Sequence, residues 1–324
     1  MTNSSTQSGE TYHTEHLVDR AAMLAMRAII ALQPAADFGP NGRVTFDQLM
    51  ERTPAADDVT YEAATVGGVS GWWCLPAAAL DDAAILYLHG GGYVVGSARA
   101  YSHFVGQIAA RAHVRIFVAD YGLAPERPYP AAVNDAEAAY RGMAQAGWSK
   151  IAIAGDSAGG GLALVTTARM INLARTNAVP RPIAAAVMSP WTDLALTGTS
   201  VVTRAKHDPL LSAAGLEAAR ESYIGQHDPA DPGVSPLYGD LADLPPTMLH
   251  VGEDEILLDD ARRYADRLQQ SGSSAELHVW KGMTHVFPTS LALLRAAREA
   301  TDNVGEFLRY HLRSNLEGAQ EGPA

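Results

Sequence analysis

Apolar positions near the start of the chain recur with two different periods, which predict a helix and then a hairpin. Between residues 15 and 32, Leu17, Leu24 and Ile29 lie at near-helical spacing among polar residues. The cluster Gly-Pro-Asn-Gly at residues 39–42 ends this pattern. Residues 61–73 are rich in β-favouring side chains around a Gly-Gly pair. We therefore expect one amphipathic helix, followed by a β-hairpin.

Six short apolar runs follow, and longer helical patterns separate them. These runs are residues 84–88, 115–119, 151–154, 184–188, 247–251 and 276–280. Strands that alternate with helices form βαβ units, because parallel neighbours need a long crossover connection. The pattern therefore predicts an α/β protein with a mostly parallel, twisted sheet and helices on both faces.

Residues 191–236 interrupt this rhythm, because Leu216, Ala219 and Tyr223 suggest helices and no strand pattern occurs. In an open parallel sheet, an insertion after the carboxyl end of a strand lies over the ligand crevice. We expect this insertion and the amino-terminal helix to form a helical cap, or lid. The predicted organisation is a cap part over 1–50, core over 51–194, cap over 195–230 and core over 231–324. The polar ends, residues 1–12 and 317–324, are expected to be disordered.

Composition and charge exclude several classes of partner. The 324 residues carry a net charge of −12, whereas binding nucleic acid requires a basic surface. No Lys/Arg-rich amphipathic stretch suggests docking on anionic membranes. The single cysteine, Cys74, excludes an intrachain disulfide. Without a signal-like leader or about 18 consecutive apolar residues, we expect a cytoplasmic protein.

The strongest chemical signal is Gly-Asp-Ser-Ala-Gly at residues 155–159. It follows the apolar run 151–154 and precedes a helical pattern that begins near Leu162. A serine on a sharp strand-to-helix turn presents its hydroxyl at the edge of the sheet, and crowding there requires glycine two residues to either side. This context predicts that Ser157 is a nucleophile.

A second motif, His-Gly-Gly-Gly-Tyr at residues 89–93, directly follows the run 84–88. Successive glycines leave backbone N–H groups open to a substrate oxygen. No lysine follows the glycines and no Gly-x-Gly-x-x-Gly spacing occurs, which argues against a nucleotide-binding loop. The motif therefore indicates an oxyanion-binding loop, in which His89 has a structural role.

The base and the acid are expected in loops after the last two strands. His285 follows the run 276–280 by a short loop, whereas the other histidines lie in strand patterns or lack such a context. Residues 252–260 hold five carboxylates, of which Asp259 and Asp260 suit the start of a helix. Asp254 and Glu255 remain as candidates to orient His285. The carboxylates lack the paired His or Cys of a transition-metal site, so no metal is expected.

Together, these motifs resemble the bacterial hormone-sensitive-lipase-like esterases of the α/β-hydrolase fold, in the subgroup with Gly-Asp-Ser-Ala-Gly. Three further stretches match that family: 120–126 (Asp-Tyr-Gly-Leu-Ala-Pro-Glu), 189–193 (Ser-Pro-Trp-Thr-Asp) and 208–212 (Asp-Pro-Leu-Leu-Ser). The resemblance covers about residues 60–310. Gly122 stands where the family usually has arginine.

The resemblance implies a serine carboxylesterase that hydrolyses short-chain esters without a cofactor. The amides of Gly91, Gly92 and Ala158 would bind the oxyanion. An ungapped match of the family's Asp-Pro-Leu-x-Asp pattern places Glu255 as the acid, and Asp254 would need a shift of one residue. The expected partner is a small-molecule ester. A homodimer, a lactone or amide hydrolase, and a non-catalytic receptor on the same fold stay open.

Overall fold

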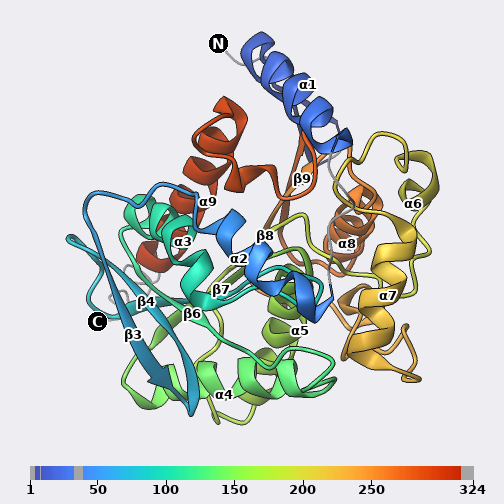
Figure 1. Ribbon diagram of the computed structural model, residues 1–324. Helices are drawn as coiled ribbons and strands as arrows, with labels where there is room; N and C mark the ends of the chain where they lie inside the picture. Colours follow the sequence, from blue (N-terminus) through green and yellow to red (C-terminus); the bar gives the residue numbers. More distant parts are fainter. Residues whose placement is uncertain (1–3, 8, 33–38, 315–324) are drawn as a thin grey trace.

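The computed structural model describes residues 4–7, 9–32 and 39–314, and a single sheet runs through its centre (Figure 1). Ten strands of the described chain pair in the order β1-β2-β10-β9-β8-β7-β5-β6-β4-β3. Their bounds are β1 Ser4–Gln7, β2 Glu10–His13, β3 Val59–Val66, β4 Val69–Pro76, β5 Ala83–Leu88, β6 Arg115–Ala119, β7 Lys150–Asp156, β8 Ala185–Met188, β9 Thr247–Gly252 and β10 Ala275–Trp280.

The six apolar runs predicted as strands correspond to β5 to β10, and their ends differ by no more than two residues. Every pair from β2 to β6 in the sheet order is parallel. The predicted hairpin is also present, because β3 and β4 pair antiparallel around Gly67 and Gly68. The mostly parallel sheet predicted from the sequence is confirmed.

Helices cover both faces of this sheet and bury it between two hydrophobic clusters. On one face, α3 and α9 pack over residues such as Ile85 and Val118. On the other, α4, α5 and α8 cover Leu86 and Ile153. The longer helices are α1 Leu17–Ala31, α2 Arg43–Met50, α3 Ala98–Ala112, α4 Ala131–Gln145, α5 Ser157–Ala174, α7 Ala213–Ile224, α8 Leu258–Gln270 and α9 Arg295–Ser314. Because both faces are covered, the central strands are apolar throughout rather than alternating.

The predicted cap segments contain helices, as expected. Helix α1 lies at the upper edge of the molecule, while α7 and the short α6 (Ser200–Thr203) lie to its right (Figure 1). The inserted segment, residues 195–230, holds α6 and α7 and no strand. The cap boundaries themselves stay a prediction.

The amino-terminal end departs from the prediction. Disorder was expected for residues 1–12, but residues 4–7 and 10–13 form β1 and β2, and β2 pairs parallel with β10. The segment 1–50 therefore contains sheet strands as well as the helices α1 and α2. The sequence signal was too weak, because strands of four residues at the sheet edge need little apolar character when the neighbouring strand supplies their pairing.

Two further expectations concern the tail at residues 317–324 and the location of the protein in the cell. The tail 317–324 lies outside the described residues. Within the described ranges, no helix is long and apolar enough to cross a membrane. The cytoplasmic location stays a prediction.

Candidate active site

Ser157 lies where β7 turns directly into α5. Its φ of 52° is in the left-handed region, which is unfavourable for a residue with a side chain and marks a strained turn. Close packing explains the two flanking glycines. A Cβ at Gly159 would lie 2.2 Å from the carbonyl oxygen of His89, and one at Gly155 would lie 2.5 Å from the oxygen of Gly159. The turn can therefore form only with glycine at both positions.

The glycine-rich loop lies beside this turn at the end of β5. Gly91 has a φ of 117°, and a Cβ there would meet the carbonyl of Val95 at 2.1 Å. Among the described residues, the amides of Gly91 and Gly92 donate no hydrogen bond. Ala158 is the second residue of α5, so its amide also lacks an intrahelical acceptor. Three backbone N–H groups are thus available near Ser157.

His285 and Glu255 continue from Ser157 in a line of hydrogen bonds. The Nε2 atom of His285 lies 2.8 Å from Ser157 Oγ, and its Nδ1 lies 2.7 Å from Glu255 Oε2. All three side chains are buried. Ser157 follows β7, Glu255 follows β9, and His285 follows β10. The structure therefore brings these three predicted site residues together at the carboxyl edge of the parallel sheet.

Ser189 supports this line from the end of β8; the sequence placed it in the matching stretch 189–193 but assigned it no role. Its hydroxyl donates to Glu255 Oε1 at 2.8 Å and accepts the amide of Val286 at 3.0 Å. The amide of Gly252 donates to the same Glu255 oxygen at 2.6 Å. Both carboxylate oxygens of Glu255 are therefore engaged, and Ser189 joins the acid loop to the loop of His285.

Asp254, the other candidate acid, points elsewhere. Its carboxylate pairs with Arg27 of α1, with Nη2 and Oδ2 2.7 Å apart. Its amide donates to the carbonyl oxygen of Met283 at 3.0 Å. Asp254 therefore joins the acid loop to α1, while Glu255 contacts His285.

The electrostatic surroundings favour a protonated His285. Burial lowers the pKa of His285, but the hydrogen bond and charge of Glu255, with the charges of Asp208 and Asp156, outweigh burial and raise the pKa above its ordinary value. Burial also raises the pKa of Asp156 to about 6, although hydrogen bonds from Tyr87 and Tyr101 oppose this shift. An imidazolium that forms at His285 is therefore stabilised by three nearby carboxylates.

Asp156 connects the serine turn with the glycine-rich loop. Its Oδ1 accepts the Tyr87 hydroxyl at 2.8 Å and the Gly90 amide at 3.1 Å. Its Oδ2 accepts the Tyr101 hydroxyl at 3.1 Å. His89 also supports the loop, because its Nδ1 lies 2.8 Å from the carbonyl oxygen of Gly90. The glycine-rich loop is thus held in place by buried hydrogen bonds.

Helix α7 of the inserted segment lies directly over this loop. A Cβ at Gly92 would meet the Cβ of Ala219 at 3.3 Å. The ring of Tyr223 stacks on that of Tyr93, with centroids 3.8 Å apart. The inserted segment therefore covers the glycine-rich loop, as a lid would.

Gly122 stands where the family usually has arginine, and the side chain of Arg127 lies beside it. A Cβ at Gly122 would lie 2.8 Å from Nη1 of Arg127. That guanidinium forms a two-bond pair with Asp135, whose Oδ2 also accepts the Gly122 amide at 2.8 Å. Arg127 thus supplies a cation next to position 122.

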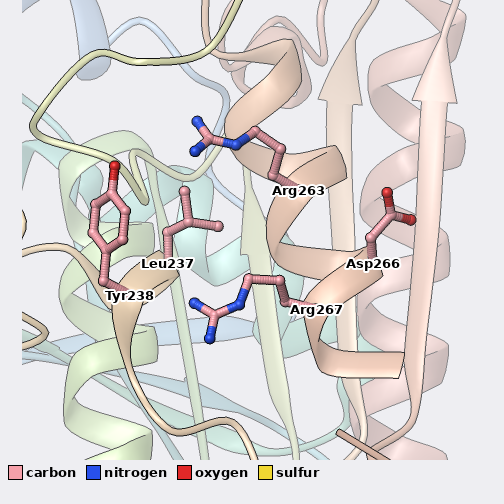
Figure 2. Close-up of a pocket in the computed structure, with 5 residues that line it drawn as sticks. All are labelled: Leu237, Tyr238, Arg263, Asp266 and Arg267. Carbon is pink, nitrogen blue, oxygen red and sulfur yellow. The ribbon is translucent and has the colours of Figure 1, made fainter. Parts of the chain in front are cut away.

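An open pocket of about 480 Å³ lies apart from these residues (Figure 2). The second half of α8 and the turn at residues 236–238 form its walls, with Arg263 and Arg267 facing Leu237 and Tyr238. None of its lining residues contacts Ser157, His285 or Glu255 through a hydrogen bond. Within the described chain, no group of three or more His, Cys, Asp and Glu side chains could hold a metal ion.

Comparison with known proteins gives a consistent family. A family model described as the alpha/beta hydrolase fold matches residues 85–289. An acetyl-hydrolase of Streptomyces hygroscopicus is 36% identical over 82% of this chain and 88% of its own. An ethyl acetate hydrolase of Pseudomonas putida is 35% identical over 72% of this chain and 75% of its own.

Solved structures agree with this result. The crystal structure of an esterase from the bacterial hormone-sensitive lipase family is 37% identical, with a TM-score of 0.84 over 92% of this chain and 99% of the other. The fold and family predicted from the motifs are confirmed. The chain belongs to the bacterial hormone-sensitive lipase family of α/β-hydrolases and is a carboxylic ester hydrolase.

Proposed function

We propose that this protein is a serine carboxylesterase for short-chain esters, in which Ser157, His285 and Glu255 form the catalytic triad. The observation that carries the proposal is the buried line of hydrogen bonds from Ser157 through His285 to Glu255, with separations of 2.8 and 2.7 Å. A serine hydroxyl is a weak nucleophile unless a neighbouring base takes its proton. His285 is within reach of that proton, and Glu255 holds the ring in the required tautomer.

In the first half of the reaction, Ser157 Oγ attacks the ester carbonyl while His285 Nε2 accepts the hydroxyl proton. The negative charge that develops on the carbonyl oxygen is bound by the amides of Gly91, Gly92 and Ala158. These donors are held in place before the substrate arrives, so little reorganisation is needed. His285 then protonates the alcohol that leaves, and an acyl-enzyme on Ser157 remains.

In the second half, His285 removes a proton from water as the water attacks the acyl carbonyl. The same three amides bind the second oxyanion, and Ser157 leaves with the proton from His285. Glu255 keeps its charge throughout and stabilises the imidazolium that forms in each half. Ser189 and Gly252 occupy its second oxygen, which limits rotation of the carboxylate.

Two observations support the preference for short acyl chains: the names of the relatives and the position of α7 over the oxyanion loop. The names of two relatives refer to acetyl and ethyl acetate hydrolysis. In this chain, Ala219 and Tyr223 of α7 lie directly over the oxyanion loop. A helix this close to the oxyanion loop limits the length of chain that fits beneath it.

The test is a turnover series on the full-length protein with p-nitrophenyl esters from acetate to palmitate, alongside lactones and anilides. We expect the highest kcat/KM for acyl chains of roughly two to eight carbons, with no activation at an oil interface. A higher kcat/KM for palmitate than for butyrate would contradict the preference. Faster turnover of lactones or anilides would change the substrate class while leaving the triad in place.

A further inference from the structure

The loop that carries Glu255, between β9 and α8, is called the acid loop here. Residues that are distant in the sequence form hydrogen bonds with it. Arg27 of α1 pairs with Asp254, immediately before Glu255. Ser200 of α6 donates to the carbonyl oxygen of Ile256, immediately after Glu255, at 2.6 Å. The acid loop is thus bonded to both segments predicted to form the cap.

Asp208 makes a second contact between the inserted segment and Ile256. Its Oδ1 accepts the amides of Leu210 and Leu211 at 2.9 and 3.0 Å, which shapes the turn of the inserted segment. Its Oδ2 accepts the amide of Ile256 at 3.0 Å, from across the interface. The Asp208 side chain is buried, at 7% exposure. A single carboxylate therefore bonds the inserted segment to the residue next to Glu255.

Arg27 bridges the inserted segment and the acid loop at a more exposed position. Its Nη1 donates to the carbonyl oxygen of His207, and its Nη2 donates to Asp254 at 2.7 Å. Residues 207 and 208 therefore lie along residues 254 to 256, with a bond at each end. The outer bond is partly exposed, so water weakens it, whereas the Asp208 bond is shielded.

We propose that Asp208 is a positioning residue that couples the seating of the inserted segment to the placement of Glu255, and hence to the alignment of His285. The inserted segment thus acts as a roof and as part of the frame of the acid loop. This inference rests on the proposed function, because it assumes that Glu255 orients His285. Through this contact, the motif at residues 208–212 would help to place Glu255 for the reaction.

The electrostatics of His285 supply a readout that a purely structural role would leave unmoved. The charged groups that act on His285 are Glu255, Asp208 and Asp156, and all three raise its pKa against the effect of burial. Removing the charge of Asp208 should therefore shift the acidic limb of kcat/KM to lower pH. A general loss of stability would lower the melting temperature without moving this limb.

The experiment compares Asp208→Asn with Asp228→Asn in the full-length protein. Asp228 also closes a turn in the inserted segment, where it accepts the amide of Ala230 at 2.9 Å, and it makes no hydrogen bond to the acid loop. An asparagine at 208 presents either an amide group to the Ile256 N–H or a neutral oxygen. We expect Asp208→Asn to lower kcat for p-nitrophenyl butyrate by about 10–100-fold, with KM changed less than about threefold. Asp228→Asn should match the wild type.

Two outcomes overturn the inference. The first is an Asp208→Asn variant with kcat within about twofold of the wild type. If that variant does not fold, Arg27→Gln tests the same interface, and we expect a kcat reduced about two- to fivefold, since the bond it removes is partly exposed. The second outcome that overturns the inference is an Asp208→Asn variant that does not fold, together with an unchanged kcat in Arg27→Gln. Normal turnover in Glu255→Gln would instead overturn the proposed function itself.

Discussion

Ser157 and Glu255 both lie just beyond the carboxyl end of a parallel strand, but different kinds of contact hold them. The turn at Ser157 is confined by backbone crowding within the sheet, since Gly155 and Gly159 leave no room for a Cβ. The loop of Glu255 is also held by side chains from α1 and the inserted segment, through Arg27 and Asp208. The nucleophile side is therefore built into the core, whereas the acid side depends in part on segments outside the sheet.

This difference has a physical consequence for the two halves of the site. Backbone crowding inside a packed core leaves few alternative conformations, so the serine turn keeps its shape as long as the domain is folded. Hydrogen bonds to segments at the surface can break locally while the rest of the fold persists. We therefore expect loss of the Ser157 hydroxyl to remove ester turnover, and loss of the contacts that hold the Glu255 loop to lower it by degrees.

The largest expected effect is on the nucleophile side. Ser157→Ala removes the only proposed nucleophile while leaving the backbone of the turn intact, so ester turnover should fall about 10⁵–10⁶-fold. A fluorophosphonate probe should label the wild type and leave this variant unlabelled. The measurement is kcat with p-nitrophenyl butyrate, with circular dichroism as the control for folding. Substantial residual turnover would place the nucleophile elsewhere.

The second prediction tests the acid side at its centre. Glu255→Gln keeps the size of the side chain but removes the charge that stabilises the imidazolium, and it favours the wrong tautomer of His285. Loss of the corresponding carboxylate in serine proteases lowers turnover about 10⁴-fold, which sets the expected scale. The measurement is kcat with a short-chain ester on protein with an unchanged dichroism spectrum. Glu255→Asp is the matched variant and should retain more activity. A nearly normal Glu255→Gln would exclude Glu255 as the acid.

The same contrast explains what the sequence could predict. The six strands β5 to β10 and the hairpin were predicted because burial on both faces and a Gly-Gly turn leave local patterns in the chain. Ser157 and the glycines around it were singled out for the same reason, since steric crowding has a signature at fixed spacing. These features arise from neighbours in the sequence or from continuous apolar runs.

Features made by distant residues left no such pattern. Ser189 belonged to a family motif, yet its bonds to Glu255 and Val286 span 66 and 97 residues and could not be predicted. The pairing of Arg27 with Asp254 spans 227 residues. The strand β2 forms because β10 offers it an edge, rather than because its own residues favour a strand. The local pattern of carboxylates left both Asp254 and Glu255 as candidates, and only the ungapped match to the family pattern favoured Glu255.

The third prediction returns to the nucleophile side and concerns the oxyanion loop. Asp156→Asn removes a charge that accepts three hydrogen bonds, including that of the Gly90 amide. The amides of Gly91 and Gly92 should then be less well aimed, which lowers kcat by about 10–100-fold with a smaller change in KM. Tyr101→Phe removes one donor only and should have a weaker effect. An Asp156→Asn variant with wild-type kcat would show that the loop keeps its shape without this carboxylate.

The fourth prediction concerns pH, where both sides of the site contribute. His285 must be neutral to accept the serine proton, and its pKa is raised by Glu255, Asp208 and Asp156 against the effect of burial. Because a raised pKa keeps the ring protonated to higher pH, the acidic limb of kcat/KM should lie above the ordinary histidine value. Activity should fall about tenfold per pH unit below that point. A profile that stays flat from pH 8 to pH 5, with the protein folded, would exclude His285 as the base.

The smallest expected effect comes from the residue next to the acid. Asp254→Asn removes the ion pair with Arg27, whose side chains are 25% and 20% exposed, and leaves the bonds of Glu255 untouched. Partly exposed ion pairs contribute about 0–1 kcal/mol, so the free energy of unfolding should change little. We expect kcat to fall no more than about fivefold, because Asp208 still holds Ile256 from the inner side. The decisive measurement is the ratio of kcat in Asp254→Asn to kcat in Glu255→Gln under identical conditions. A ratio far above one follows if charge at residue 255 orients His285, whereas a ratio below one would mean that Asp254 takes this role in solution.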